Sequence, residues 1–267
     1  MRELSLAALT VLELSPVEMV RCAAAVGYTH VGLRLIPATD NEPTWDVVGD
    51  TAMVREVAAA LADTGIQVLD VEILRLRPDT DVRDFATTLE TGARLGARHV
   101  LVAGNDPDEA RLSARLAALC ELAAPLRLAI YLEPMPWTDV RDFVQAARIV
   151  ANCAQANAGV LIDPIHFDRA GNHASQIAML PPERLAYAQF CDAPAERPTD
   201  LAGLLHQARA ERLPPGTGGL DLRGILAALP PDTPLSLEIP MQSRALTALD
   251  RARLAFSLTR RFLSAVP

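Results

Sequence analysis

The feature that most constrains the fold of this chain is a regular alternation of short apolar runs with longer amphipathic segments. The short runs are rich in Val, Ile and Leu, which is typical of parallel strands buried on both faces. The longer segments have the apolar periodicity of helices that cover such a sheet. Eight short runs are present, at Leu4–Leu9, His30–Leu35, Gln67–Ile73, His99–Ala103, Leu126–Glu133, Gly159–Asp163, Leu185–Cys191 and Leu235–Glu238.

The longer segments carry signals that start and stop helices. The first helix is expected to begin at Ser15-Pro16-Val17-Glu18, a capping box with proline at the first helical position, and to stop at Gly27. A later helix is expected over about Asp81–Leu95, where a glycine follows, and the last helix over about Ala245–Leu263.

Eight strand–helix units in 267 residues predict an α/β fold, a single-domain (β/α)8 TIM barrel that spans residues 1–267. The alternative is an open, doubly wound sheet. Such a sheet usually carries a Gly-rich phosphate loop after its first strand, and this sequence has none there. In a barrel, the loops after the strands form the catalytic rim, so the irregular stretches Ile36–Gly49 and Pro194–Gly219 are candidate lids.

The charged residues exclude some classes of function. All 25 residues counted as Lys or Arg are arginine, and the formal net charge is −8. No basic stretch offers a face that would neutralise phosphates, so a nucleic-acid partner is not expected. Schiff-base catalysis is excluded because it needs a lysine amine. Carbonyl chemistry here must therefore take its electrophile from a metal ion or from hydrogen-bond donors.

The cysteines and the N-terminus bear on the compartment. The four cysteines are scattered without Cys-x-x-Cys spacing, so we expect small buried residues in a reducing compartment. The first apolar run is too short to cross a membrane and is followed by no convincing cleavage site. We therefore expect a cytoplasmic protein with no membrane partner, and the sequence leaves a homo-oligomer open.

Polar residues end several of the apolar strands, and three of them are carboxylates. Glu133, Asp163 and Glu238 close three strands, and Gln189 lies on the strand between the last two. A buried carboxylate is costly unless it is paired or bound to a metal. Asp163 by itself could serve only as the N-cap of the next helix. Three anions that converge from neighbouring strands, however, require a cation.

Four motifs, in this order and spacing, resemble the xylose isomerase-like TIM-barrel superfamily: EPMPWTD at 133–139, GVLIDPIHFDRAG at 159–171, YAQFCDAP at 187–194, and LPPGTGGLDLRGIL with SLEIP within 213–240. That superfamily includes sugar-phosphate isomerases, ketose 3-epimerases, inosose dehydratases and endonuclease IV. The resemblance implies one divalent metal ion with Glu133, Asp163, Gln189 and Glu238 as its ligands. In the epimerase branch the two glutamates also move the substrate proton, and the residue matching His166 contacts substrate.

Gln189 departs from the family pattern, which has histidine at this position in most members. An amide oxygen makes the ligand set all-oxygen, which favours Mg²⁺ or Mn²⁺ over Zn²⁺. A branch that resembles bacterial 3-dehydroshikimate dehydratases has glutamine in the same Q-x-x-D-A-P context, followed by an arginine, here Arg212, and a P-G-x-G turn. The turn at 215–219 could present N–H groups to an anion, but a loop before a helix capped by Asp221 is favoured. Endonuclease IV is a poor match because it needs many histidines, and this chain has five.

Candidates for substrate contact come from the same strand ends and loops. Trp137 is expected either to stack on the C–H face of a sugar or to close the barrel top. Arginines can bind a substrate carboxylate or phosphate bidentately, although each is more often a surface or salt-bridged residue. The candidates are Arg34, Arg75, Arg77, Arg197 and Arg212, of which Arg34, Arg197 and Arg212 are favoured.

The chemistry expected is proton transfer next to a carbonyl of a small polyhydroxylated substrate. The metal would polarise the carbonyl, Glu133 and Glu238 would act as base and acid, and His166 would orient a hydroxyl or stabilise the developing charge.

Three functions stay open on these residues. A sugar or sugar-phosphate isomerase or epimerase is favoured. A dehydratase of a cyclic hydroxy-ketone such as 3-dehydroshikimate is the alternative. A non-catalytic barrel is the third, and the intact Glu133, Asp163 and Glu238 argue against it.

Overall fold

The computed structural model describes residues 2–242 and 245–266, and its centre is a sheet of eight parallel strands. The order around the sheet is β6-β5-β4-β3-β2-β1-β8-β7. A parallel bridge between Ile162, just beyond β6, and Ala188 on β7 joins the two ends of the sheet. The predicted closed barrel is therefore confirmed. The strands are β1 (Leu4–Ala7), β2 (His30–Arg34), β3 (Gln67–Leu76), β4 (His99–Gly104), β5 (Ala129–Glu133), β6 (Ala158–Val160), β7 (Ala188–Phe190) and β8 (Leu235–Leu237).

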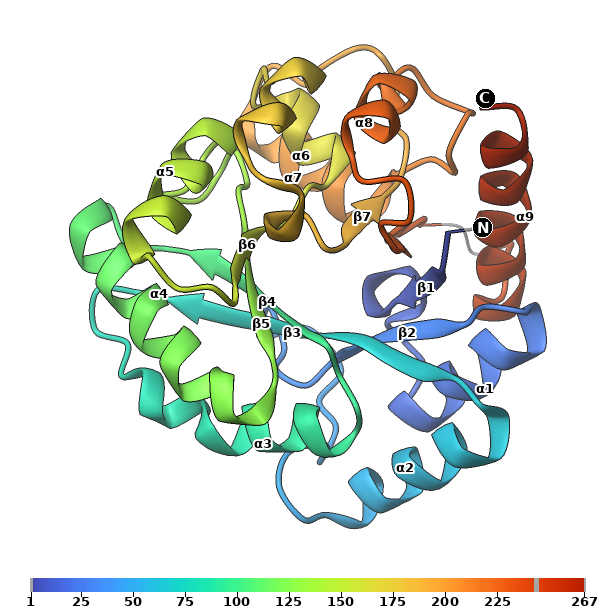
Figure 1. The fold of residues 1–267 in the computed structure, drawn as a ribbon. Coiled ribbons are helices and arrows are strands. Elements are labelled where there is room, and N and C mark those ends of the chain that lie inside the picture. The colour runs from blue at the N-terminus through green and yellow to red at the C-terminus, as the bar shows by residue number, and fades with distance from the viewer. Residues whose placement is uncertain (1, 243–244, 267) are drawn as a thin grey trace.

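Helices surround the sheet (Figure 1). Within the described residues, none of them has both the length and the apolar character needed to cross a bilayer. The helices are α1 (Pro16–Val26), α2 (Ala52–Thr64), α3 (Ala86–Arg94), α4 (Glu109–Ala123), α5 (Phe143–Cys153), α6 (Pro164–Arg169), α7 (Leu201–Ala210), α8 (Leu222–Ala228) and α9 (Ala248–Ser264).

The ends of the first helix are those expected from its residues. Ser15 accepts a hydrogen bond from the N–H of Glu18, and the Glu18 carboxylate accepts one of 2.8 Å from the N–H of Ser15. The helix ends at Gly27, whose φ of 104° is left-handed and favours glycine because it has no Cβ. The last helix begins at Ala248, a few residues later than expected, because Thr247 is its N-cap.

Several predicted boundaries were wrong, and each error has a local cause. β1 stops at Ala7 because Ala8–Val11 forms a 3₁₀ turn, and β5 starts at Ala129 because Ala124–Leu126 forms another. Apolar composition does not distinguish such buried turns from strand. The helix expected over 81–95 is a 3₁₀ turn at Val82–Phe85 followed by α3, and the stretch 194–219 contains α7.

β3 is longer than predicted and runs on to Leu76. Its pairing with β4 shifts register between Val71 and Leu74 and then continues to the pair Leu76–Gly104. A bulge of this kind changes which side chains point into the barrel. β3 thereby places both Glu72 and Arg75 at the barrel mouth.

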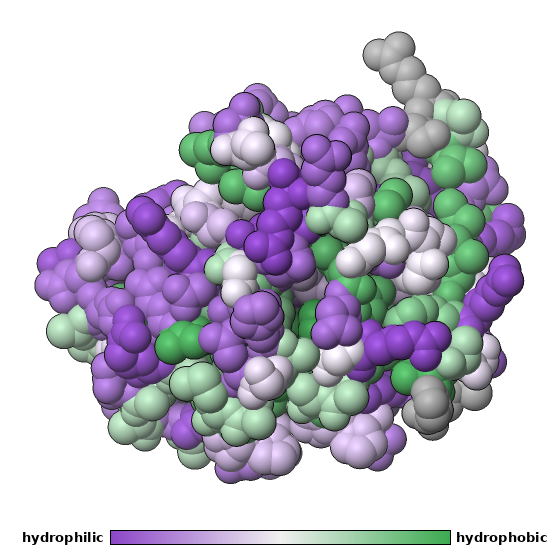
Figure 2. All heavy atoms as spheres, turned by 90° about the horizontal axis from the view of Figure 1, so that it is seen from above, coloured by the Kyte–Doolittle hydropathy of each residue, from purple (hydrophilic) through white to green (hydrophobic). Residues whose placement is uncertain are grey.

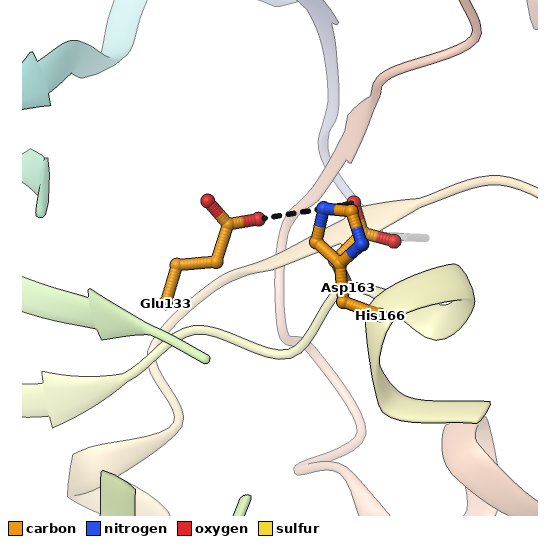
Figure 3. Close-up of side chains that lie close together, drawn as sticks. All are labelled: Glu133, Asp163 and His166. Atoms are coloured by element: carbon orange, nitrogen blue, oxygen red, sulfur yellow. Dashed lines mark ion pairs between the residues drawn. The ribbon is translucent and has the colours of Figure 1, made fainter. Parts of the chain in front are cut away.

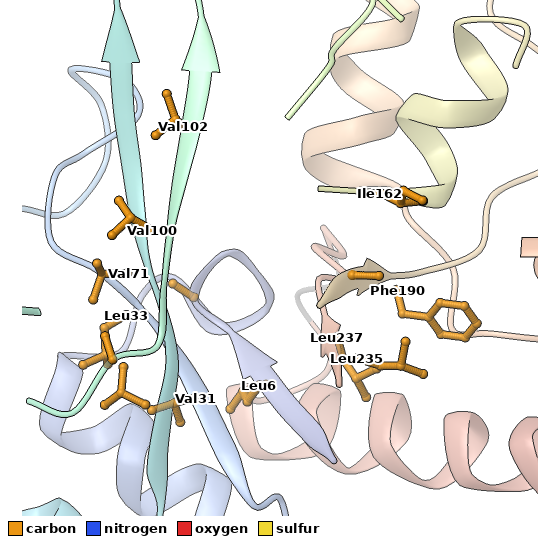
Figure 4. Close-up of a cluster of buried hydrophobic side chains, with 14 of the residues drawn as sticks. Leu6, Val31, Leu33, Val71, Val100, Val102, Ile162, Phe190, Leu235 and Leu237 are labelled. Atoms are coloured by element: carbon orange, nitrogen blue, oxygen red, sulfur yellow. The ribbon is translucent and has the colours of Figure 1, made fainter. Parts of the chain in front are cut away.

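Apolar side chains fill two layers. The larger cluster lies between the strands and the helices and includes Leu6, Val31, Leu33, Val100 and Leu237 (Figure 4). The four cysteines are buried, as expected. The smaller cluster fills the barrel interior with Leu69, Ile73, Leu101, Ala103, Tyr131, Met135, Leu161 and Tyr187.

The outer surface is mainly polar. On the face seen in Figure 2, hydrophilic residues predominate and hydrophobic ones gather toward the side where α9 lies. An apolar groove lined by Leu4, Leu226 and Phe256 lies at the amino-terminal end of β1. This is the end of a β/α barrel that serves stability rather than catalysis.

Candidate active site at the carboxyl ends of the strands

The four predicted metal ligands come together at the carboxyl ends of neighbouring strands. Glu133 ends β5, Asp163 follows β6, Gln189 lies on β7, and Glu238 directly follows β8. All four are buried, with 2 to 4% of their surface exposed. Glu133, Gln189 and Glu238 line one hollow at the barrel mouth. The convergence expected from the sequence is therefore present.

Asp163 has two roles in the structure. Its Oδ1 accepts a hydrogen bond of 3.0 Å from the N–H of Ile165, which makes it the N-cap of α6. Its Oδ2 accepts one of 2.6 Å from Nη1 of Arg212. Asp163 is thus both the N-cap of α6 and a member of the buried carboxylate cluster.

His166 lies on the first turn of α6, three residues after Asp163. Its Nε2 is 3.6 Å from Oε1 of Glu133 and 3.7 Å from Oδ2 of Asp163 (Figure 3). The ring of Trp137 meets the imidazole at 88°, with centroids 4.8 Å apart. Burial lowers the pKa of His166 to about 4, although Asp163 acts in the opposite direction. The imidazole is therefore neutral near pH 7, with a lone pair available as a ligand or acceptor.

Arg212 lies inside the carboxylate cluster rather than at its edge, and only 2% of it is exposed. Its Nη2 is 2.8 Å from Oε2 of Glu238, and Nη1 forms the bond to Asp163. Its Nε donates to the backbone oxygen of Ala208 at 2.6 Å. Burial would lower the pKa of Arg212, but Asp163 and Glu238 hold it well above its usual value. This predicted substrate-binding arginine is a permanent cation that joins two of the predicted metal ligands.

The carboxylates of the cluster differ in acidity. Burial raises the pKa of Glu133 well above its usual value, and Glu238 and Asp163 raise it further. Burial also raises the pKa of Glu238 to about 7, against the effect of Arg212. Burial acts in the same direction on Asp163, but Arg212 and His166 hold its pKa below the usual value. Three buried carboxyl groups thus share one buried cation, Arg212, and the raised pKa of Glu133 favours its neutral, protonated form unless a further cation binds.

Two oxygen atoms of the cluster provide a test of whether a metal ion fits. Oε1 of Glu133 and Oε1 of Gln189 are buried and have no hydrogen-bond partner among the residues that the structure describes. His166 Nε2 is slightly too far from Glu133 to count as one. A buried acceptor left unpaired costs about 1–3 kcal/mol. Carboxylate and amide oxygens are preferred ligands of Mg²⁺ and Mn²⁺, so these residues fit a divalent cation.

The residues that could hold the ion are therefore Glu133, Asp163, Gln189 and Glu238. His166 is an addition that the sequence did not assign to the metal. Ligand atoms of Glu133, Asp163 and His166 lie within 4.8 Å of one another, which is close enough for one ion to bind all three.

The other predicted substrate contacts lie in different surroundings. Trp137 lines the hollow. Arg34 also lines it, but its guanidinium lies 3.1 Å from Glu72 and 2.8 Å from Glu42, so two carboxylates already balance its charge. Arg197 is exposed, pairs with Asp168 at 3.0 Å, and does not line the hollow.

The glycine-rich turn after Arg212 holds an internal carboxylate. The N–H groups of Gly216, Gly218 and Leu220 donate to Asp192 at 2.8–3.1 Å. Asp221 then caps α8, as expected. The favoured interpretation of this turn as a loop before a helix is confirmed, and its donors are occupied by Asp192.

Two arginines that the sequence did not favour as substrate contacts line the hollow. Arg75 lies within β3, because that strand continues past its predicted end, and it lines the hollow. Arg209, on the last turn of α7, also lines it and was overlooked. Its place in the stretch 194–219 after the seventh strand is the signal that could have found it, since such loops form the catalytic rim of a barrel.

Comparisons with known proteins agree with this architecture. A model of the family described as xylose isomerase-like TIM barrel matches residues 20–261. A 3-dehydroshikimate dehydratase from Pseudomonas aeruginosa is 32% identical to the chain over 202 residues. That match covers 69% of this chain and 31% of the enzyme, so the chain spans less than a third of the relative's length.

Two solved structures share the fold. A xylose isomerase-like TIM barrel/4-hydroxyphenylpyruvate dioxygenase fusion protein has a TM-score of 0.80 and 24% identity, and the match covers 98% of this chain and 44% of that one. The IOLI protein, solved with a zinc atom, has a TM-score of 0.80 and 21% identity, with 99% of each chain covered. At these identities the two structures support the fold alone.

Proposed function

Because this chain belongs to the xylose isomerase-like TIM barrel family, we propose that it is a metal-dependent enzyme that removes a proton next to a carbonyl group. We further propose that the reaction is the dehydration of a cyclic hydroxy-ketone of the 3-dehydroshikimate type. The residues alone favoured an isomerase or epimerase. The 32% identity to a 3-dehydroshikimate dehydratase is what moves our preference to the lyase.

The observation that carries the proposal is the pair of unpartnered oxygens in a buried acidic cluster. Among the described residues, Oε1 of Glu133 and Oε1 of Gln189 lack hydrogen-bond partners, and both side chains line the hollow beside Glu238. Such an arrangement is unfavourable without a cation and suitable with one. A bound divalent ion would polarise the substrate carbonyl and make the neighbouring C–H more acidic.

The side chains of the hollow supply the rest of the chemistry. Glu133 and Glu238 come from β5 and β8, and two carboxylates on separate strands can take and return a proton. Neutral His166 can donate a hydrogen bond to a substrate oxygen while Trp137 holds its ring. Arg212 keeps Asp163 and Glu238 in place through its two ion pairs.

The proposed dehydration balances without a further reactant. A carboxylate takes the proton from the carbon next to the ketone, and the hydroxyl on the following carbon leaves as water once it is protonated. The remaining dienone moves one ring proton to its ketone oxygen and becomes 3,4-dihydroxybenzoate. No oxidant or reductant takes part.

The second candidate is a sugar or sugar-phosphate isomerase or epimerase. The presence of Glu133 and Glu238 on separate strands favours it, since epimerisation needs an acid and a base on opposite faces of the substrate carbon. We propose Mg²⁺ or Mn²⁺ for either reaction because the four ligands offer only oxygen. The zinc in the IOLI structure and the nearby His166 make Zn²⁺ the alternative.

The deciding assay is to incubate the protein with Mg²⁺ or Mn²⁺ and 3-dehydroshikimate and follow the ultraviolet absorbance of the aromatic product. Product formation at an enzymatic rate that is lost in Glu238→Gln is the expected result. Absence of product, together with deuterium exchange into a panel of ketoses, would replace the lyase by the epimerase. If the protein shows neither activity and binds no metal, the non-catalytic barrel would be the remaining function.

A further inference from the structure

Two arginines of the hollow form no ion pair with any carboxylate among the described residues. Arg34, Arg75, Arg209 and Arg212 all line it. Arg34 and Arg212 are each paired with two carboxylates. Neither Arg75 nor Arg209 has an ion-pair partner within the part of the chain that the structure describes. These two cations therefore lie at the mouth of an acidic site and remain available to a ligand.

The contacts of Arg75 hold it in position without neutralising it. Its Nη1 donates to Oδ1 of Asn105 at 3.1 Å, and its Nη2 lies 3.5 Å from the backbone oxygen of Ala38. Burial lowers the pKa of Arg75, and the nearby Arg77, Arg209 and Arg34 lower it further, whereas Glu133 acts in the opposite direction without forming an ion pair with it. A group that brings negative charge to this point would relieve the repulsion between these guanidinium groups.

Arg209 lines the same hollow from a different element, α7. It is an exposed residue on α7, which precedes the segment that carries Arg212. Arg75 and Arg209 also line an outer rim together with Arg77 and the exposed Asp79. Arg77 and Asp79 do not line the hollow itself. The unbalanced positive charge inside the hollow thus belongs to Arg75 and Arg209.

We infer that Arg75 and Arg209 bind a carboxylate group of the substrate, and that this subsite selects acidic substrates over neutral sugars. The inference rests on the proposed function, because it places the reacting carbonyl at the acidic cluster and the anionic group at the rim. A neutral polyol would leave both guanidinium groups without an anionic partner, whereas a carboxylate accepts charge-assisted hydrogen bonds from both.

A carboxylate fits this rim better than a phosphate does. Phosphate sites usually add backbone N–H donors to their cations. The glycine-rich turn after Arg212 does not supply such donors, because its Gly216, Gly218 and Leu220 N–H groups already donate to Asp192. Two side-chain cations without backbone donors are suited to a monoanion.

The test compares two ligands that differ only in the carboxylate. Calorimetry on the Mg²⁺-loaded protein measures the Kd of 3,4-dihydroxybenzoate and of catechol, which share the diol. We expect 3,4-dihydroxybenzoate to bind about 10- to 100-fold more tightly, the range of one or two charge-assisted hydrogen bonds. Arg75→Gln and Arg209→Gln should each remove most of this ratio while leaving catechol and Mg²⁺ affinity unchanged.

Arg253→Gln is the matched control, because it removes the same charge from an exposed position on α9 and should keep the ratio. A ratio near one in the wild-type protein, or an unchanged ratio in both hollow variants, would overturn the inference. Tighter binding of inorganic phosphate than of the carboxylate, lost in both variants, would show that the anion is a phosphoryl group and that the carboxylate assignment is wrong.

The subsite and the proposed reaction can fail separately. An arginine-dependent ratio in a protein that does not convert 3-dehydroshikimate would support the subsite and reject the dehydration. Conversion of 3-dehydroshikimate with an unchanged KM in both variants would support the reaction and overturn the subsite.

Discussion

The side-chain amide of Gln189 donates a hydrogen bond of 2.9 Å to Oε1 of Glu238 and so links β7 to β8 inside the acidic cluster. This bond assigns the amide nitrogen to Glu238 and leaves the amide oxygen as the atom without a partner among the described residues. The glutamine thus offers the cluster another oxygen ligand. A histidine at this position would offer a nitrogen instead.

Replacing Gln189→His should shift metal preference toward Zn²⁺ or Co²⁺, because imidazole is a softer ligand than an amide oxygen. Calorimetric titration of both proteins with Mg²⁺, Mn²⁺, Co²⁺ and Zn²⁺ measures the order of affinities. Wild-type protein is expected to bind Mg²⁺ or Mn²⁺. Its free energy of unfolding should rise by about 2.7 kcal/mol when the free metal concentration is a hundredfold above Kd. An identical order in the two proteins would place Gln189 outside the ligand set.

Replacing Glu133→Gln or Glu238→Gln should reduce proton exchange by about 100- to 10,000-fold, because an amide of the same shape neither accepts nor returns a proton. The measurement is deuterium incorporation from solvent into substrate, with circular dichroism as the check on folding. Glu90→Gln, an exposed change on α3, is the control and should exchange normally. Exchange at the normal rate in either site variant would remove that glutamate from the proton-transfer role.

Replacing Arg212→Gln should lower the free energy of unfolding by about 3–5 kcal/mol, because it leaves Asp163 and Glu238 as uncompensated buried charges. Urea denaturation in the absence of metal measures this effect. Arg197→Gln breaks an ion pair at an exposed arginine and should cost at most about 1 kcal/mol. Equal costs for the two variants would mean that the buried pairs do not support the cluster.

Replacing His99→Phe should make stability less dependent on pH. Burial lowers the pKa of His99 to about 3, with Arg98 and His30 adding to the effect, whereas the unfolded residue titrates near about 6.5. Between these pH values the unfolded chain binds a proton at His99 that the folded protein does not bind. The stability that the neutral, buried ring contributes is therefore present above pH about 6.5 and is lost as pH falls toward 3.

Phenylalanine keeps a ring over Tyr187, on which His99 stacks at 4.7 Å, and cannot be protonated. We expect the slope of unfolding free energy against pH, measured by urea denaturation at several pH values in this window, to decrease by up to about 1.4 kcal/mol per pH unit. Equal slopes for the variant and the wild type would mean that His99 does not titrate as a buried neutral base.

The strand pattern and four residues of the site were predictable from the sequence alone. Buried parallel strands are apolar along their length, so a polar residue at a strand end is conspicuous. In a barrel all carboxyl ends meet on one face, so Glu133, Asp163, Gln189 and Glu238 had to converge once eight such strands were recognised. His166 was implied by the resemblance to the superfamily, and the structure places its ring beside Glu133 and Asp163.

The charge partners and the remaining side chains of the hollow were decided by the tertiary structure. Glu72 and Arg75 are three residues apart, and a regular strand would point them to opposite faces. The register shift between Val71 and Leu74 brings both into the hollow. Arg212 became the partner of Asp163, whereas Arg75 and Arg209 have no ion-pair partner among the residues that the structure describes. Ion pairing depends on distances between strands and loops that local sequence does not encode.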